Sequence, residues 1–289
     1  MTNEQDDEMS KWRPCVEQGN LYVIPDLNGN INLLKKVCSS ILPLRKSEGI
    51  IDRLVFLGDY MDRDVNGHLV LDYLIEIHKK YKDQVIFLFG NHEQILLSAL
   101  NLMPNQNISL QSQDMWYRTW LANGGLQTLM GYLERVGNDT PAISLPRWRV
   151  KDIIPKEHIE FLQTVPVNFY ETDSFIFVHG GCDPHLSVSK QEPEVLWWDR
   201  SLCKFVKKCI DSKKEDQIDW NKCIVTGHNA SIKPIIHEKF MMLDISATRK
   251  ELLLTELNSL SAMCAHVDKS KLIAYELQET DMSHGPKSW

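Results

Sequence analysis

The chain has 289 residues, a formal net charge of −7, 43% apolar residues and 25% charged residues. This length and balance fit one large globular domain and exclude a disordered or fibrous protein. The net negative charge repels phosphate backbones and therefore disfavours general nucleic-acid binding. No apolar run in the sequence is long enough to predict a membrane span.

The first residues and the cysteine pattern predict a cellular location. The chain starts with the acidic, polar segment MTNEQDDEMSK, which is unlike a secretory signal. Its seven cysteines are an odd number and include no CxxC pair, which indicates buried or free thiols in a reducing compartment. Together these features predict a cytoplasmic protein.

The first hundred residues alternate between short apolar runs and helical periodicity. Apolar runs at 21–24, 50–57 and 85–89 predict strands, and the spacing of apolar residues predicts helices over 30–42 and 68–80. Strands that alternate with helices form βαβ units, so we expect a parallel sheet that is buried on both faces.

The middle and the end of the chain differ from this pattern. Residues from about 98 to 165 have helical spacing and predict a helical insertion that caps the sheet. Short β-rich runs then return, and the strands they predict are 175–178, 223–226, 240–243, 252–257 and 272–277. The predicted fold class is α/β, with two packed mixed sheets flanked by helices in a single domain over residues 20–277. Residues 1–19 and 278–289 are predicted to be polar termini.

Polar clusters follow five of the predicted strands. They are PDLNG at 25–29, GDYMDR at 58–63, GNHE at 90–93, HGG at 179–181 and GHN at 227–229. Since the carboxyl ends of parallel strands meet at one edge of a sheet, the first three loops should lie together. Asp, Asn and His side chains suit divalent ions such as Mn²⁺, Fe²⁺ or Zn²⁺, so the sequence predicts a metal site. The side chains that the first three loops bring together are Asp26, Asn28, Asp59, Asn91 and His92.

Several of these clusters resemble the motifs of a known family. The clusters at 58–63 and 90–93 look like the second and third signatures of the metal-dependent PPP-type phosphoprotein phosphatases, which are calcineurin-like metallophosphoesterases. The histidine motifs follow in the family's order. Segments 120–129, 154–162 and 196–200 resemble connecting segments of bacterial and phage-type members. The resemblance covers about residues 20 to 250 and implies the calcineurin-like fold.

This resemblance implies a centre of two divalent ions, with Mn²⁺ as the first choice and Fe or Zn as alternatives. Metal one would be held by Asp26, the residue at position 28 and Asp59. A hydroxide that bridges the two ions would attack phosphorus directly, without a phosphoenzyme. The implied ligands of metal two are Asp59, Asn91, His179 and His228.

The resemblance also implies the residues that contact the substrate. Arg63 and Arg200 would bind the phosphate oxygens, and His92, oriented by Asp62, would protonate the leaving alkoxide. Judged without the family, Arg63 could equally form a salt bridge to a neighbouring aspartate, Asp62 or Asp64. The substrate-binding residues implied in this way are Arg63, Arg200, Asn91 and His92.

One ligand position departs from the family. The first signature of the family reads Gly-Asp-x-His-Gly, whereas this chain has Asn28 in place of the histidine. An amide oxygen is a weaker donor than an imidazole nitrogen, so the first metal should be bound more weakly. Three explanations stay open: a natural variant with a weakened site, a pseudoenzyme, or a deliberate inactivating substitution. Since the other catalytic positions are present, we favour an active enzyme as the parent. Asp64, where the family often has glycine, is a milder departure.

Three functions follow from these motifs. The leading hypothesis is a phosphoprotein phosphatase, supported by the two arginines, by Glu93 and by an insertion that could shape a peptide groove. The second is a hydrolase of dinucleoside polyphosphates (Ap4A-type) or of RNA caps. Residues 227–231 resemble the last motif of the symmetrical diadenosine tetraphosphate hydrolases and favour this second hypothesis. The third is a pseudophosphatase that binds phosphorylated partners without turnover, for which Asn28 is the only support.

Five tryptophans could stack on the bases of a nucleotide substrate, although packing is their commoner role. They are Trp116, Trp120, Trp148, Trp197 and Trp198.

Overall fold

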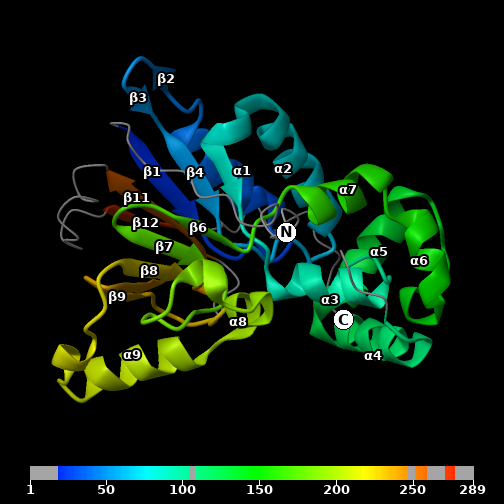
Figure 1. Cartoon of the computed structure of the whole chain (residues 1–289). Coiled ribbons are helices and arrows are strands. Elements are labelled where there is room, and N and C mark those ends of the chain that lie inside the picture. Colours follow the sequence, from blue (N-terminus) through cyan, green and yellow to red (C-terminus); the bar gives the residue numbers. More distant parts are fainter. Residues whose placement is uncertain (1–18, 104–107, 247–250, 259–270, 277–289) are drawn as a thin grey trace, which may run out of the picture.

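Two mixed five-stranded sheets form the centre of the molecule (Figure 1). The computed structural model describes residues 19–103, 108–246, 251–258 and 271–276. The first sheet has the order β12-β11-β1-β4-β5 and the second the order β6-β7-β8-β10-β9. The strands of the first sheet are β1 (Asn20–Ile24), β4 (Arg53–Phe56), β5 (Val85–Phe87), β11 (Glu251–Asn258) and β12 (Lys271–Glu276). Those of the second are β6 (Phe169–Glu171), β7 (Phe175–Val178), β8 (Cys223–Thr226), β9 (Ile235–His237) and β10 (Phe240–Met242).

The two sheets pack face to face through alternate residues of their strands. In the first sheet Val55 and Leu57 face the second sheet, whereas Leu54 and Phe56 belong to the core on the opposite face. The second sheet contributes residues such as Phe177 to the layer between the sheets. This period of two is what strands that are buried on both faces require. The predicted α/β class with two packed mixed sheets is therefore confirmed.

Helices cover the outer faces of both sheets (Figure 1). Helices α1 (Ile31–Ile41) and α2 (Gly67–Tyr81) lie on the first sheet, and α8 (Pro193–Trp198) and α9 (Ser201–Asp211) lie on the second. Helix α1 begins after Asn30, whose side chain accepts a hydrogen bond from the backbone N–H of Leu33. The predicted helices over 30–42 and 68–80 thus form within one residue of their expected limits.

The predicted insertion is helical and lies to one side of the sheets, at the right of Figure 1. Tyr132 OH lies 2.7 Å from His158 Nδ1, and His158 Nε2 lies 2.9 Å from Asp72 Oδ1, so these polar contacts join the insertion to α2. A Cβ added at Gly131 would lie 1.8 Å from the carbonyl oxygen of Val65, so the insertion also contacts the loop before α2 closely. Helix α3 (Asn91–Ala99) leads into the insertion, whose helical segments are α4 (Leu110–Trp120), a π-helical turn at Leu121–Gly125, α5 (Leu126–Arg135), α6 (Arg147–Ile153) and α7 (Lys156–Thr164).

The prediction of one strand over 50–57 is wrong. Residues Ile50–Ile51 form β3, which pairs with β2 (Lys46–Ser47) in a separate hairpin, and only 53–56 join the first sheet. The break falls at Asp52, whose buried carboxylate accepts hydrogen bonds from Arg45 and from the backbone N–H of Asn20. The short strands β6 and β9 were not predicted. Strands β5 and β10 are equally short but wholly apolar, whereas β6 and β9 each end in a polar residue, so neither is a run of three apolar residues.

The remaining predictions about the whole chain are tested only in part. The bounds 20–277 for a single domain stay a prediction, and the predicted polar termini lie almost entirely outside the described residues. Over the ranges that the structure describes, no helix has both the length and the apolar character needed to cross a membrane. Among the same residues five cysteines are free and buried: Cys38, Cys182, Cys203, Cys209 and Cys223.

Candidate metal centre

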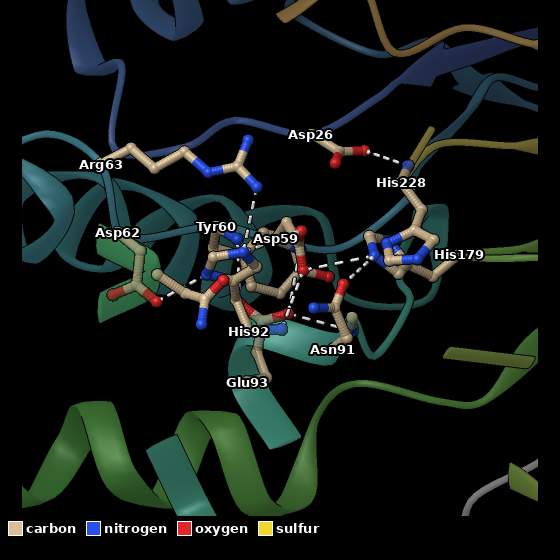
Figure 2. Close-up of polar contacts among 12 residues, drawn as sticks. Asp26, Asp59, Tyr60, Asp62, Arg63, Asn91, His92, Glu93, His179 and His228 are labelled. Carbon is tan, nitrogen blue, oxygen red and sulfur yellow. Dashed lines mark hydrogen bonds and ion pairs between the residues drawn. The ribbon is translucent and has the colours of Figure 1, made fainter. Parts of the chain in front are cut away.

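Five loops bring the predicted site residues together at one edge of the two sheets (Figure 2). Strands β1, β4 and β5 are parallel neighbours, and so are β7 and β8, so the loops after them leave on the same side. The loops position Asp26 and Asn28 after β1, Asp59 after β4, Asn91 and His92 after β5, His179 after β7, and His228 after β8.

Asp59, His179 and His228 form a cluster that could hold a metal ion. One ligand atom from each lies within 4.8 Å of the others. The Nε2 atom of His179 lies 3.3 Å from Asp59 Oδ1 and 3.0 Å from the amide oxygen of Asn91. Its other ring nitrogen, Nδ1, donates to the carbonyl oxygen of Leu57 at 2.7 Å. This contact fixes the ring and turns Nε2 toward the cluster, as a metal-binding histidine requires.

The charges of this cluster favour a cation. Burial alone would raise the pKa of Asp59, but His179 and His92 outweigh it and lower that pKa. Burial would lower the pKa of His179, but the charge of Asp59 and the hydrogen bond to it raise the pKa to about 10. The same negative charge that favours a proton on His179 also favours a divalent cation there.

His228 offers a neutral nitrogen to the cluster. Burial and the neighbouring His179 lower its pKa to about 3, so the ring carries no proton charge at neutral pH. Its Nε2 atom is buried and has no hydrogen-bond partner within the described structure. An imidazole nitrogen in this state is a ready metal ligand.

Asp26 and Asn28 lie beside this cluster, and the backbone N–H of Asn28 donates to the Asp59 carbonyl oxygen at 2.9 Å. Asp26 is buried, and its Oδ1 accepts a hydrogen bond from the backbone N–H of His228 at 2.9 Å. Burial, followed by the charge of Asp244, raises the pKa of Asp26. Both polar atoms of the Asn28 amide are buried, and neither has a partner among the described residues. A cation at this point would satisfy the amide oxygen, so the residues present fit a metal with mixed oxygen and nitrogen ligands.

The backbone is strained in the same loops. Among the described residues eight that are not glycine have a positive φ, and five of the eight belong to this edge. Such conformations cost about 1–3 kcal/mol each and cluster at functional sites, where packing enforces them. The five residues are Asn28, Asp59, Asp62, Arg63 and His228.

His92 and Asp62 form a buried pair beside the metal cluster. Asp62 Oδ2 lies 2.7 Å from His92 Nδ1, as the predicted orienting role requires. Burial would lower the pKa of His92, but the charge of Asp59 and the hydrogen bond to Asp62 raise it to about 9. Trp120 Nε1–H donates to Asp62 Oδ1 at 3.0 Å, and the hydroxyl of Thr128 donates to the same oxygen at 2.8 Å. Two residues of the insertion therefore fix the carboxylate that contacts His92.

The two predicted arginines are exposed at the rim of the centre. Nη2 of Arg63 lies 3.1 Å from His92 Nε2, and Nη1 of Arg200 donates to the carbonyl oxygen of His228 at 3.2 Å. In the described structure Arg63 makes no ion pair with Asp62 or Asp64, so the salt-bridge alternative is not observed. Figure 2 shows the Arg63 guanidinium directed toward His92.

Two supports of the site escaped the sequence analysis. Glu93 was noted only as part of a motif, but its buried carboxylate accepts backbone N–H groups from Asp59, Tyr60 and Gly90 and so holds two of the loops together. Asp244 follows β10 and was not predicted at all. The available signal was its place just after a predicted strand, where the other polar clusters also lie.

Several solved structures share the fold of this chain. The solved structures that resemble the chain include a provisionally assigned diadenosine tetraphosphatase, with 15% identity, a TM-score of 0.52, and coverage of 93% of this chain and 97% of that one. A serine/threonine phosphatase from Saccharomyces cerevisiae has 11% identity, a TM-score of 0.52, and coverage of 93% and 83%. A cold-active protein-tyrosine phosphatase from a psychrophilic Shewanella species has 15% identity, a TM-score of 0.50, and coverage of 94% and 85%. At these identities the likeness shows a shared fold.

No curated protein sequence matches the chain significantly. The sequence model of the calcineurin-like phosphoesterases, however, matches residues 19–239, which include all the predicted metal ligands. The chain therefore belongs to the calcineurin-like phosphoesterase family.

Proposed function

We propose that this chain is a dinuclear metal-dependent phosphoprotein phosphatase that hydrolyses phosphomonoesters on protein side chains. The proposal is supported mainly by one observation: three kinds of functional group lie side by side at one edge of the two sheets. They are a buried cluster of carboxylates and imidazoles, a His92–Asp62 pair, and two exposed arginines. Metal binding, proton donation and phosphate binding each need one of these groups. The predicted cytoplasmic location stays a prediction, supported by the free thiols.

Each of the two proposed ions would have its own set of ligands, and Asp59 would belong to both sets. Asp26, Asn28 and Asp59 would hold the first ion. Asp59 would also bind the second ion, together with three other side chains. Mn²⁺ is the ion that we propose, with Fe or Zn as alternatives, because all three accept mixed ligands of this kind. When bound, two such ions supply a nucleophile at neutral pH and neutralise charge on the phosphoryl oxygens. The proposed ligands of the second ion are Asp59, Asn91, His179 and His228.

The side chains of the protein would bind the substrate and move one proton. Arg63 and Arg200 would bind the phosphoryl oxygens, because a guanidinium can donate two parallel hydrogen bonds to a phosphate. Water would lose one proton to solvent and add to phosphorus opposite the leaving oxygen, and the bond from phosphorus to that oxygen would break. His92 would give its proton to the leaving oxygen, while Asp62 keeps the ring in place. Asn91 and His92 lie next to this phosphate position and would also contact the substrate.

A hydrolase of dinucleoside polyphosphates or RNA caps is the second candidate. A cavity of about 470 Å³ begins at Asn229, next to His228, and Lys207 and Lys233 line it. The two lysines of this cavity, which the carboxylate of Asp211 also lines, could bind the additional phosphates of such a substrate. Of the tryptophans considered for base stacking, Trp120 and Trp197 are buried in the core and cannot stack on a ligand. Trp198 is partly exposed, and its ring lies edge-on to His228.

A substrate panel distinguishes these two functions. Phosphoserine, phosphothreonine and phosphotyrosine peptides, diadenosine tetraphosphate and capped RNA would be compared in one Mn²⁺ buffer, with EDTA as the metal-free control. We expect greater turnover of the phosphopeptides. A preference of about a hundredfold for the dinucleotide would contradict the proposal. In that case Lys207→Gln and Lys233→Gln should weaken dinucleotide hydrolysis and leave aryl phosphate hydrolysis unchanged.

The pseudophosphatase alternative depends on Asn28 and has its own test. We expect Asn28→His to raise turnover at least about 10-fold and to add metal at the first site, because an imidazole replaces a weaker amide ligand. Metal stoichiometry and turnover would be measured for both proteins in the same Mn²⁺ buffer. Equal activity with two ions in each protein would show that the amide is a competent ligand. Two bound ions without activity in either protein would favour a phosphate-binding protein and contradict the enzyme.

A further inference from the structure

Asp244 lies at the same sheet edge as the metal ligands, although no motif includes it. Strand β10 is parallel to β8, with Met242 opposite Thr226. Two residues beyond this pair, Asp244 follows β10 as His228 follows β8. The backbone N–H of Ser231 donates to the Asp244 carbonyl oxygen at 3.0 Å, which ties the two loops together.

The Asp244 carboxylate is buried and only half satisfied. The residue is 1% exposed, and its Oδ1 accepts a hydrogen bond from the backbone N–H of Ser246 at 2.9 Å. Its Oδ2 is buried and has no hydrogen-bond partner among the described residues. A buried carboxylate oxygen without a donor is costly, so this atom indicates a missing positive partner.

Asp244 and Asp26 both contact the loop that follows β8. The backbone N–H of His228 donates to Asp26 Oδ1 at 2.9 Å, and that of Ser231 donates to the Asp244 carbonyl oxygen at 3.0 Å. Among the charged neighbours of Asp26, Asp244 has the largest effect in raising its pKa. Asp59 adds a further negative charge that acts on both residues. The positive charge of Arg63 lowers the pKa of Asp244 and so partly offsets this repulsion, but Arg63 lies exposed at the rim. Three buried carboxylates at one place are compatible with a folded protein when a cation or protons compensate them.

The same half of the centre contains the Asn28 substitution. The Asn28 amide is neutral, and its two buried polar atoms have no partner in the described part of the chain. We propose that Asp244 is a further residue of the metal centre, whose carboxylate charge strengthens cation binding at Asp26 and compensates for Asn28. This proposal rests on the dinuclear site proposed above.

The role proposed for Asp244 can be tested by measuring metal binding rather than activity. Four proteins would be compared: the parent, Asp244→Asn, Asn28→His and the double variant. Asparagine keeps the shape of Asp244 and can still accept from the Ser246 N–H, but it removes the charge. We expect Asp244→Asn to weaken the weaker of the two Mn²⁺ sites by at least about 10-fold in the parent. In the Asn28→His protein the loss should be below about 3-fold, because the imidazole makes compensation unnecessary. Titration calorimetry and metal stoichiometry would give both values.

Thermal unfolding separates this role from a purely structural one. In EDTA, Asp244→Asn should unfold at the same or a higher temperature than the parent, because a buried repulsion is lost. In Mn²⁺ its gain in unfolding temperature should be smaller than that of the parent. Asp219→Asn removes one charge from an exposed side chain and serves as the matched control, with no change expected in Mn²⁺ affinity.

Three results would overturn the proposal. Unchanged Mn²⁺ affinity in Asp244→Asn would exclude a role in metal binding. A lower unfolding temperature in EDTA together with an unchanged Mn²⁺ gain would show a structural role. If Asp244→Asn lowered Mn²⁺ affinity equally in the parent and in the Asn28→His protein, Asp244 would not compensate for Asn28. If Asp59→Asn also left Mn²⁺ binding unchanged, the dinuclear site itself would be wrong, so failure of the site is distinguishable from failure of the Asp244 assignment.

Discussion

Asp59→Asn is expected to abolish Mn²⁺-stimulated hydrolysis of an aryl phosphate, with a loss of more than about 1,000-fold. The side chain occupies the middle of the centre, with Oδ1 3.3 Å from His179 Nε2 and hydrogen-bonded to the His92 N–H at 3.1 Å. As the shared ligand it would serve both ions. The loss of a group that only orients a metal ligand already costs about 10–100-fold, so the loss of a ligand shared by two ions should cost more. Activity and metal content would be measured together.

The Asp219→Asn protein is the control for charge, and unfolding in EDTA shows whether Asp59→Asn is folded. Asp59→Asn should contain less metal than the parent, whereas Asp219→Asn should match the parent in both measurements. Substantial activity in a folded Asp59→Asn protein would contradict a centre in which two ions share this residue.

Arg63→Ala and Arg200→Ala should each lower turnover by about 100-fold and leave the metal content near that of the parent. Both guanidinium groups are exposed at the rim, where they can meet a phosphate and do not touch the carboxylates of the centre. Losing a charge-assisted bidentate contact affects the bound phosphoryl group rather than the ions. Steady-state kinetics and metal analysis on the same samples would measure both effects.

Lysine at these positions provides a matched comparison, because it keeps the charge and loses the planar fork of donors. We expect Arg63→Lys and Arg200→Lys to retain more activity than the alanine variants but less than the parent. Loss of metal or a lower unfolding temperature in the alanine variants would instead indicate that the arginines have a structural role.

The sequence was sufficient to predict the location of the centre, because its residues follow strands that are easy to recognise. Short apolar runs that end in polar clusters identified the loops of Asp26, Asp59 and His179. Parallel pairing places the loops of Asp26 and Asp59 together, whereas the packing of the second sheet on the first brings His179 to Asp59. Their roles as ligands stay predictions. The sheet of the first hundred residues was predicted in the same way, apart from the break at Asp52, where a buried carboxylate overrides an apolar run.

Contacts between distant parts of the chain could not be predicted. Asp62 meets Thr128 across 66 positions, and Asp26 meets the backbone of His228 across 202. No local periodicity records such pairs, because they depend on how the insertion packs and how the second sheet lies on the first. Asp244 was overlooked for a different reason, since a single aspartate after a strand is usually an ordinary turn residue.

The hydrogen bonds of Asp62 have a consequence for which substrates this protein can hydrolyse. The candidate metal ligands come from loops at the ends of strands, whereas the carboxylate that orients His92 is held by Trp120 and Thr128 of the insertion. In the proposed mechanism, metal binding and proton delivery would therefore depend on different parts of the fold and could be lost separately. If a change in the insertion released Asp62, the centre would still cleave esters of acidic phenols, whose leaving oxygen needs no proton. It would fail on alkyl esters such as phosphoserine, so under the proposed function the packing of the insertion would set the range of leaving groups.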